Sequence, residues 1–425
     1  MKTNIADKCF NRLRKSNLRT HTGTGIYAHK AKFLLNYFCR RQYIDPVILF
    51  KTMAGIYIHI PFCRKACCYC NFHFSVSQKL LPQMVNAIAQ EMVLRTEYIN
   101  EKIETVYFGG GTPSLLRAGD IALLLNKMHS LFHVDDNAEI TLEANPDDMA
   151  ADKLSAWKSM GINRLSIGTQ SFFDEDLRWM NRAHNARQAY NSINLAVQSG
   201  FDNISTDFIY GTPGLTNEQW LQNLEMACQL HIPHLSCYAL TVEPHTVLRR
   251  MIDKQKKEDV DAEKQSAQFE LLMQWAAGKG YEHYEISNFA KPGFRSLHNS
   301  SYWQGKHYIG LGPSAHSFNG NTRQWNISNN ALYIENLHKN IVPFEQEELT
   351  STQQLNEYIM TALRTAKGIN LFHLNRLSGE KITTDIIKEA ERFIQQDLME
   401  RKENALVLTS KGKLFADGIA ASLFR

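Results

Sequence analysis

The sequence contains no uninterrupted apolar run of the length that crosses a bilayer, which is about 20 residues. It also lacks a disulfide framework, because four of its eight cysteines fall within residues 63–70 instead of being spaced along the chain. The first absence excludes a membrane-spanning protein and leaves at most peripheral contact with the inner face of a membrane. The second favours a reducing compartment, which we expect to be the cytoplasm.

Acidic side chains are nearly absent from residues 1–52, which contain eleven Lys and Arg but only Asp7 and Asp45, a net charge of +9. The rest of the 425-residue chain has a net charge of −5. A nucleic-acid-binding arm and an organelle transit peptide are two interpretations of such a segment. We favour a third, a dispensable tail or start-site artefact, because no helical or strand periodicity organises it. Met53 stands just before the first expected strand, so we predict that a chain starting there folds.

The most informative motif is Cys63-x3-Cys67-x2-Cys70, which directly follows the apolar run 56–62. Three thiolates on one loop can bind three irons of a [4Fe-4S] cluster, whereas a fully ligated cluster needs four. The open iron suits chelation of S-adenosylmethionine (SAM), so that an electron from the cluster can split the sulfonium and release a 5'-deoxyadenosyl radical. This spacing is the signature of the radical SAM superfamily, and we predict these three cysteines as the cluster ligands.

Two alternatives concern the same loop. A structural zinc site would need a fourth ligand, which His59 or His73 could supply. Cys68 adjoins Cys67, but using Cys68 as the middle ligand gives spacings that do not match the motif. We therefore interpret Cys68 as a passenger thiol and favour the iron–sulfur cluster over zinc.

Short β-rich apolar runs alternate with longer amphipathic stretches after Met53. Strands are expected at 55–60, 104–109, 138–144, 164–169, 203–210 and 234–241, and helices at 79–100, 116–132, 149–160, 173–199 and 217–230. This alternation predicts right-handed βαβ units and a parallel sheet. Six units are too few for an eight-stranded barrel, so the expected fold is α/β, a partial (β/α)6 barrel with its site at the carboxyl ends of the strands.

The pattern changes beyond residue 245. A charged helix is expected near 258–280, followed by an irregular aromatic region at 281–319. A first helix is expected after a capping box starting at Ser351, and it is followed by a helix at 384–399, a strand at 405–408 and a last helix. This order predicts a smaller helical, winged-helix-like domain. We do not expect it to bind DNA. The expected divisions are 1–52 as an extension, 53–245 as the barrel, 246–344 as a barrel extension and 345–425 as the C-terminal domain.

Polar and glycine residues recur where the expected strands end. Glycines in the triplet 109–111 let backbone approach an amino-acid moiety such as the methionine part of SAM. Glu143 is placed to hold a cationic amino group, and Gln170 and Asp207 to hydrogen-bond ribose hydroxyls. Arg182, expected on the helix after the fourth strand, can pair with a carboxylate through its bidentate fork.

The chain resembles the radical SAM proteins related to oxygen-independent coproporphyrinogen III dehydrogenase, and within them the HemW-type heme chaperones. The motifs of this resemblance are Tyr-x-His-x-Pro-Phe-Cys at 57–63, Gly-Gly-Gly-Thr-Pro at 109–113, Glu-x-Asn-Pro at 143–146 and Leu-Thr-x-x-Gly at 408–412. The resemblance implies SAM contacts by Tyr57, Tyr69, Gly110, Gly111, Thr112, Glu143, Gln170, Arg182, Asp207 and Ala239.

Two features separate the branches of this family. The decarboxylating enzyme has a fourth cysteine two residues after the last cluster ligand, where this chain has Phe72. The chaperone branch is associated with a His-Asn-x-x-Tyr-Trp pattern, which is found here as His298, Asn299, Tyr302 and Trp303. An imidazole can ligate heme iron and the neighbouring aromatic rings can cover a porphyrin face. A hydrogen-bonded core histidine is the alternative interpretation of His298.

The resemblance therefore implies a heme chaperone that binds heme, a [4Fe-4S] cluster and SAM, and passes heme to acceptor hemoproteins such as respiratory ones. The alternative is an oxygen-independent coproporphyrinogen III dehydrogenase, in which the radical would abstract hydrogen from two propionate chains and loss of carbon dioxide would give vinyl groups. Phe72 and the His298 motif favour the chaperone, and we do not expect the dehydrogenase activity.

Overall fold

The computed structural model describes residues 53–425, so the expectations for residues 1–52 lie outside the described residues. Six strands are those expected from the apolar runs. They are β1 (Met53–Ile60), β2 (Lys102–Gly110), β3 (Val134–Ala144), β4 (Arg164–Gln170), β5 (Ile204–Tyr210) and β6 (His234–Ala239). Each pairs in parallel with the next, and their apolar side chains are buried with almost no exposed surface. Burial on both faces explains why these strands appear as continuous apolar runs.

Helices connect the strands as predicted, with one correction. They are α2 (Leu81–Leu94), α3 (Ala118–Leu131), α4 (Ala151–Ser159), α5 (Asp174–Trp179), α6 (Ala186–Gln198) and α7 (Asn217–Gln229). The single helix expected at 173–199 is wrong, because the chain breaks at Asn181, which has a φ of 59°, and starts again at the N-cap Asn185. This break places Arg182 on a turn instead of a helix, close to the carboxyl end of β4.

Residues 281–319, expected to be irregular, contain short strands and a helix, so that prediction is wrong. Four-residue strands show too little periodicity to be recognised. The segments are β7 (Glu282–Glu285), β8 (Asn288–Ala290), α10 (Leu297–Trp303), β9 (Tyr308–Leu311) and β10 (His316–Phe318), with β11 (Thr322–Asn326), α11 (Asn330–His338) and β12 (Phe344–Glu348) beyond them.

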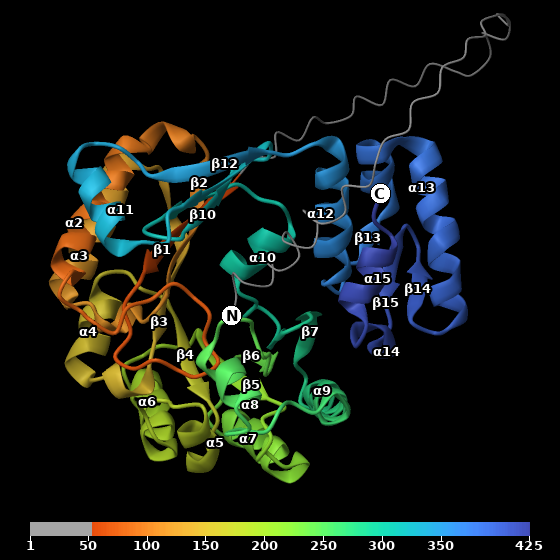
Figure 1. The fold of residues 1–425 in the computed structure, drawn as a ribbon, viewed down its shortest axis with the longest axis horizontal. Helices are drawn as coiled ribbons and strands as arrows, with labels where there is room; N and C mark the ends of the chain where they lie inside the picture. The colour runs from red at the N-terminus through yellow and green to blue at the C-terminus, as the bar shows by residue number, and fades with distance from the viewer. Residues whose placement is uncertain (1–52) are drawn as a thin grey trace, which may run out of the picture.

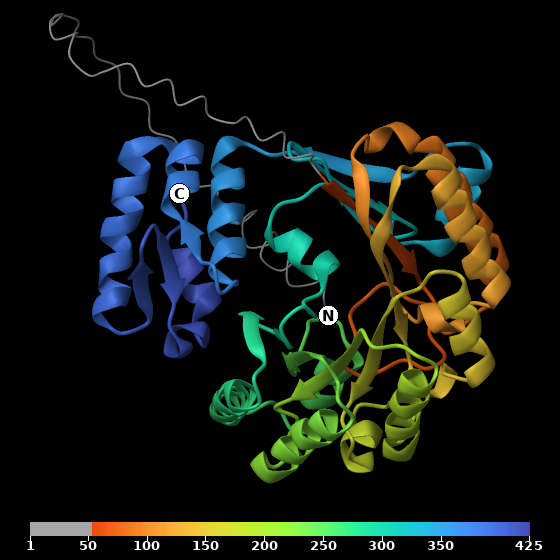
Figure 2. The same ribbon diagram turned by 180° about the vertical axis from the view of Figure 1, so that it is seen from behind.

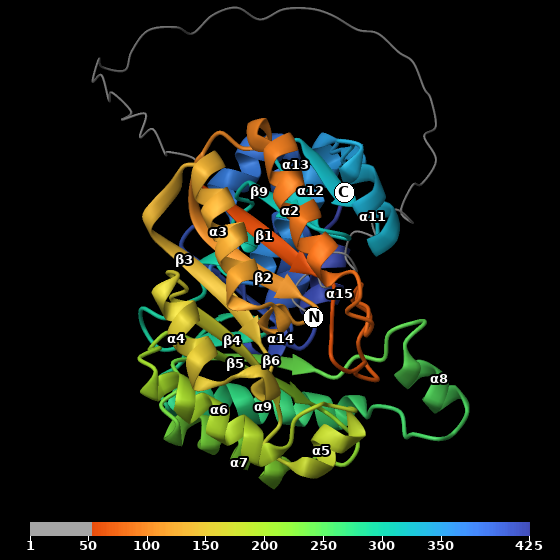
Figure 3. The same ribbon diagram turned by 90° about the vertical axis from the view of Figure 1, so that its left-hand side faces the viewer.

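These strands extend the central sheet at both edges. The sheet has 12 strands in the order β12-β11-β10-β9-β1-β2-β3-β4-β5-β6-β8-β7, with β9 parallel to β1. The sheet does not close on itself, which confirms a partial barrel. Figure 1 shows the curved sheet with α2, α3, α4 and α6 outside it, and α10 between the sheet and the C-terminal part. Seen from the side, α2 and α3 lie next to each other over β1 and β2 (Figure 3).

The C-terminal part is helical with a small sheet, as predicted. It comprises α12 (Ser351–Leu363), β13 (Ile369–Asn370), α13 (Leu371–Gln395), β14 (Met399–Lys402), β15 (Ala405–Leu408), α14 (Ser410–Lys413) and α15 (Ala416–Ser422). Its three strands form a separate sheet and its apolar core is distinct from that of the barrel. Figure 2 shows this part beside the large sheet, with α12 facing α10.

Two local expectations for the C-terminal part need correction. The capping box begins at Thr350, whose hydroxyl accepts a hydrogen bond from the backbone N–H of Gln353, and not at Ser351. Thr and Ser are both good caps, so the motif fits either register. The helix expected at 384–399 begins at Leu371 and kinks at Gly379, which has a φ of 79°, and it ends before β14.

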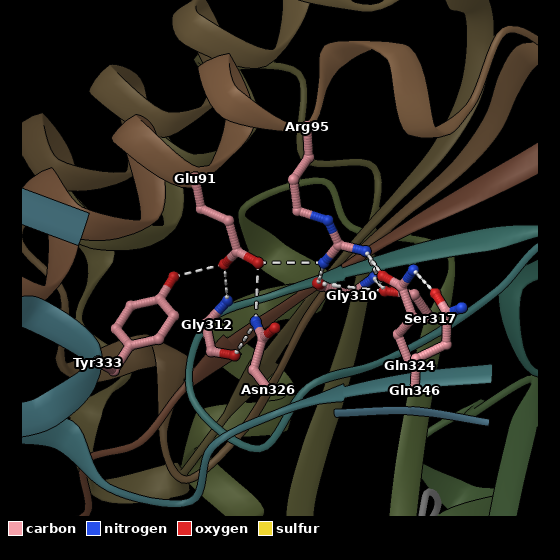
Figure 4. Close-up of polar contacts among 9 residues, drawn as sticks. All are labelled: Glu91, Arg95, Gly310, Gly312, Ser317, Gln324, Asn326, Tyr333 and Gln346. Carbon is pink, nitrogen blue, oxygen red and sulfur yellow. Dashed lines mark hydrogen bonds and ion pairs between the residues drawn. The ribbon is translucent and has the colours of Figure 1, made fainter. Parts of the chain in front are cut away.

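A buried polar network attaches the extended sheet edge to helix α2 (Figure 4). Glu91, which is completely buried, accepts hydrogen bonds from Tyr333 (2.5 Å), from Asn326 (2.8 Å) and from the backbone of Gly312 (2.8 Å). It also forms an ion pair with Arg95 at 3.1 Å. Tyr333, Asn326 and Gly312 lie on α11, on β11 and in the loop after β9, and Arg95 in turn donates to Gly310 O on β9 at 3.1 Å, so the network holds that edge against α2.

We expect Glu91→Ala to lower the free energy of unfolding by about 3–5 kcal/mol, because it leaves Arg95 as an unpaired buried charge. The measurement is urea denaturation followed by circular dichroism. Glu97→Ala, at an exposed position just after the same helix, is the matched control and should change little. Equal effects of the two substitutions would contradict a stabilising role for the network.

Among residues 53–425, none of the helices combines the length and apolar character that crossing a membrane requires.

Candidate functional site

The carboxyl ends of the parallel strands open into a cavity of about 730 Å³, which we call the first cavity. It brings together all the side chains predicted from the sequence as site residues except Trp303. These are Tyr57, Cys63, Cys67, Tyr69, Cys70, Gly110, Gly111, Thr112, Glu143, Gln170, Arg182, Asp207, Ala239, His298, Asn299 and Tyr302. Successive parallel strands end at the same edge of a sheet, which is why side chains far apart in the chain meet here.

The cysteine loop follows β1 and is attached to its neighbours by several contacts. Cys63 donates its backbone N–H to Ser75 O at 3.0 Å, and Asn181 donates to Ala66 O at 2.7 Å. Arg64 pairs with Asp147 at 3.3 Å and also with Asp148. These contacts fix the loop to the segment after β3 and to the connection between α5 and α6.

The four thiols of the loop divide into two groups. Cys63, Cys67 and Cys70 line the first cavity, whereas Cys68 does not. Cys68 is 3% exposed and packs with Leu177 and Leu248 outside the cavity, where its thiol lies 3.5 Å from Trp179 O. The three thiols that share the cavity are those predicted from the spacing as cluster ligands, and that assignment stays a prediction.

The three cavity thiols are of the donor type that an iron–sulfur cluster needs. Desolvation raises the pKa of Cys63 to about 12, and it also raises the pKa of Cys70. Buried thiols of this kind are protonated at neutral pH and release their protons to a metal that binds them. Each thiolate of a [4Fe-4S] cluster binds a different iron. The donor type and the shared cavity therefore fit such a cluster.

A zinc site is less consistent with the same residues. His59 contacts Tyr57 through Nδ1 at 3.1 Å and His73 O through Nε2 at 3.0 Å, and His73 Nε2 contacts Asn330 at 2.7 Å. Both histidines that could complete a zinc site thus have ring nitrogens engaged elsewhere. Within residues 53–425, no three Cys, His, Asp or Glu side chains converge as ligands of a single metal ion.

Arg182 lies on the turn between α5 and α6 and connects the cysteine loop to two strand ends. Its Nη2 donates to Asn145 Oδ1 at 2.7 Å and to Gly168 O at 2.8 Å, and its Nη1 contacts Cys67 Sγ at 3.3 Å. Desolvation opposes its charge, but Cys67 and Tyr69 raise the pKa of Arg182 above its ordinary value. Its buried Nε–H has no hydrogen-bond partner among the described residues, so a donor remains for an anionic group.

The glycine triplet at the end of β2 lies against the end of β1. Glu143 Oε2 accepts from the backbone N–H of Gly110 at 3.2 Å, and Glu143 Oε1 accepts from Tyr107 at 2.6 Å. Gly111 donates its N–H to Ile60 O at 2.9 Å, and a Cβ at Gly111 would lie only 2.6 Å from Phe62 O. Glycine is required there because the backbones of β1 and β2 approach so closely.

Gln170 and Asp207 lie on the neighbouring strands β4 and β5. Gln170 is the last residue of β4 and has a φ of 65°, a conformation that is unusual for a non-glycine residue and is often found at functional sites. Asp207 on β5 is 3.3 Å from the hydroxyl of Ser166. Both side chains line the first cavity, as expected for groups that contact a cofactor.

The His-Asn-x-x-Tyr-Trp segment forms helix α10 at the border of the first cavity. His298 is 1% exposed, and its ring nitrogens contact Thr105 Oγ1 at 2.8 Å and Tyr302 OH at 2.9 Å. Its ring stacks on Tyr107 with a centroid distance of 4.9 Å. These contacts match the alternative of a hydrogen-bonded core histidine. Trp303 lies outside the first cavity and lines a second one.

Sequence reasoning missed the wall of the first cavity that comes from later parts of the chain. Tyr238 on β6 and Phe269 on α9 (Ala262–Gly278) line it, as do Lys413, Phe415 and Asp417 of the C-terminal part. No local motif marks these residues, because their position depends on how the C-terminal part packs against the barrel. Phe415 directly precedes α15 and its side chain is 54% exposed, so its apolar character alone does not place it at the cavity.

Comparisons with known proteins agree with this geometry. The Radical SAM superfamily matches residues 57–227 and the HemN C-terminal domain matches residues 349–415. The chain is 32% identical to the heme chaperone HemW of Bacillus subtilis, over 86% of this chain and 98% of that protein. It is 31% identical to HemW of Haemophilus influenzae, over 85% and 95% of the two chains.

A mouse protein and a solved structure extend the comparison. The mouse mitochondrial radical S-adenosyl methionine domain-containing protein 1 is 31% identical, over 88% of this chain and 87% of its own. The solved structure of coproporphyrinogen III oxidase (HemN) from Escherichia coli superposes with a TM-score of 0.76 at 22% identity, covering 88% of this chain and 90% of that one. At this identity the likeness shows a common fold.

Proposed function

Because the chain belongs to the HemW family of radical SAM proteins, we propose that it is a heme chaperone, which binds heme and transfers it to acceptor hemoproteins. The observation that supports this proposal best is the position of the His-Asn-x-x-Tyr-Trp helix. Its Asn299 and Tyr302 line the first cavity and also the second cavity beside it. A ligand of the second cavity would thus be in contact with the border of the cofactor site.

The same residues support SAM binding next to the cysteines. When bound, the cluster would supply an electron to SAM and SAM would supply a radical. In our assignment Glu143 accepts from the SAM amino group, Gln170 and Asp207 bind the ribose hydroxyls, and Arg182 donates its remaining Nε–H to the carboxylate. The glycine triplet leaves room for the methionine chain, and Tyr57, Tyr69, Thr112 and Ala239 complete the contacts.

The proposal also covers the cellular compartment and the protein that receives the heme. We propose that the protein works in the cytoplasm, in peripheral contact with a membrane when it meets a respiratory acceptor. The clustered, unpaired cysteines support a reducing compartment.

A second candidate function is oxygen-independent decarboxylation of coproporphyrinogen III. Radical decarboxylation also needs SAM bound beside a cluster, and the side chains that would bind both line the first cavity. Phe72, which lines the cavity where the decarboxylating branch has a fourth cysteine, argues against it.

Anaerobic titration of the cluster-reconstituted protein with hemin separates the two functions. We expect saturable binding of a single heme per chain, seen as a Soret band in difference spectra, and transfer of that heme to an apo-hemoprotein. A matched titration with protein from which cluster and SAM are omitted reports whether they alter heme affinity. If the protein showed no saturable heme binding and converted coproporphyrinogen III, the chaperone function would be wrong and the decarboxylase function would take its place.

A further inference from the structure

The second cavity has a volume of about 760 Å³ and lies between the extended sheet edge and helices α12 and α13. It shares six lining residues with the first cavity, so these side chains lie between the two spaces: Tyr57, Tyr238, Ser287, Asn299, Tyr302 and Arg364. Sites for small molecules and cofactors usually have volumes of about 300–1,000 Å³. The second cavity is thus large enough for a cofactor of its own.

Its lining combines aromatic rings with a buried cation. Tyr302 packs edge-on against Tyr308 at 4.7 Å between ring centroids, and Tyr308 lies 6.3 Å from Phe318. Arg364, which is 6% exposed, donates to Asp417 at 2.6 Å and lies 5.4 Å from the Trp303 ring. Its buried Nε–H has no hydrogen-bond partner among the described residues. Aromatic walls with one available guanidinium donor suit a flat, apolar ligand that carries carboxylates.

His298 is poorly placed to ligate iron in this arrangement. Its two ring nitrogens contact Thr105 and Tyr302, and its ring is enclosed against Tyr107. Ligation would require one of these contacts to break and the buried ring to move. His298 is therefore better described as a residue that fixes Tyr302 at the border between the cavities.

Two other histidines, His316 and His373, line the second cavity. His373 Nδ1 accepts from the Arg376 guanidinium at 3.0 Å, which leaves the proton of the neutral ring on Nε2, the nitrogen that faces away from this contact. His316 lies on β10, two residues before Phe318, and alternation along a strand directs both side chains to the same face. His316 and Phe318 thus face the second cavity together, whereas His373, whose ring lies 4.5 Å from that of Tyr358, has one ring nitrogen engaged by Arg376.

We propose that the second cavity holds the porphyrin of heme, with His316 as the axial ligand of the iron and Arg364 as the partner of a propionate. The proposal rests on heme binding as the function of the chain. Because Tyr57 belongs to both cavities, heme in this position would lie directly across that side chain from the cofactor site.

Hemin titration of single variants tests the axial ligand. We expect His316→Gly to lose the wild-type Soret band and to weaken heme binding at least about tenfold, and added imidazole to restore the band. His373→Ala should keep the wild-type spectrum, and His298→Ala should keep the position of the Soret band although loss of its contact with Tyr302 weakens binding. Cluster absorbance should be retained in all three. A wild-type spectrum in His316→Gly, or a failure of imidazole to restore the band, would overturn the assignment. Absence of heme binding by the wild-type protein would instead overturn the proposed function.

The location of the porphyrin has a separate test. Leu377→Trp places a large ring in the second cavity and should weaken heme binding, whereas Lys388→Trp, at an exposed position of the same helix, should not. Heme dimethyl ester, which lacks free propionates, should bind the wild-type protein about tenfold more weakly than heme. Arg364→Gln should remove this difference. Equal affinities for the two ligands in the wild-type protein, or full affinity in Leu377→Trp, would contradict this location.

Discussion

Replacing Cys63, Cys67 or Cys70 with alanine should abolish the iron–sulfur absorbance of the reconstituted protein, whereas Cys68→Ala should keep it. Only the first three thiols line the first cavity, and each would bind a separate iron, so loss of one leaves two irons without a protein ligand. Cys68 lies outside the cavity among apolar side chains. The measurement is anaerobic reconstitution with iron and sulfide, followed by absorbance and iron content.

The Cys68 variant is the internal control for this experiment, because it removes a thiol from the same loop. Its apolar surroundings predict a modest loss of stability and no loss of iron. Cluster loss in Cys68→Ala, with a normal cluster in one of the other variants, would show that the ligand assignment is wrong. Reduced SAM binding is expected to accompany cluster loss, since SAM would chelate the open iron.

Gly111→Ala is expected to destabilise the fold by about 1–3 kcal/mol and to impair cluster assembly. A Cβ at this position would lie 2.6 Å from Phe62 O and 2.7 Å from Ile60 O, which are backbone atoms that cannot turn aside. The end of β1 would have to move, and the cysteine loop starts directly after it. Thermal unfolding and cluster content after reconstitution measure the two effects.

Gly214→Ala provides the matched control at another strand-end loop. Gly214 is exposed, and no atom lies within 4 Å of the position that its Cβ would take. This variant should retain stability and cluster content. A Gly111→Ala protein with wild-type stability and a normal cluster would contradict the close approach of the two strand ends.

The central strands could be predicted from the sequence, because burial on both faces makes each of them a continuous apolar run. The edges of the sheet could not, because β7, β8, β9 and β10 have only three or four residues each. Their pairing is decided by neighbours from distant parts of the chain, such as Glu91, which binds the loop after β9. The single helix predicted at 173–199 failed because Asn181 adopts a left-handed conformation, which periodicity does not reveal.

The site residues that lie on the parallel strands, or directly after them, could be predicted from the sequence. The cysteine loop, the glycine triplet, Glu143, Gln170 and Asp207 all meet in the first cavity. Arg182 was also identified, but on a helix instead of the turn it occupies. Lys413 and Phe415 could not be found, since their place at the cavity depends on the docking of a separate helical part.

That docking has a thermodynamic consequence. The C-terminal part contributes side chains to the same cavity as the cysteine loop, so a ligand that fills the cavity contacts both parts of the chain. Any ligand that binds the assembled state more tightly than a detached one shifts the equilibrium towards assembly, and assembly raises the affinity for the ligand by the same factor. Binding of the cofactor and packing of the C-terminal part against the barrel then favour each other. We therefore expect the connection between β12 and α12 to become more resistant to proteolysis as the SAM concentration rises.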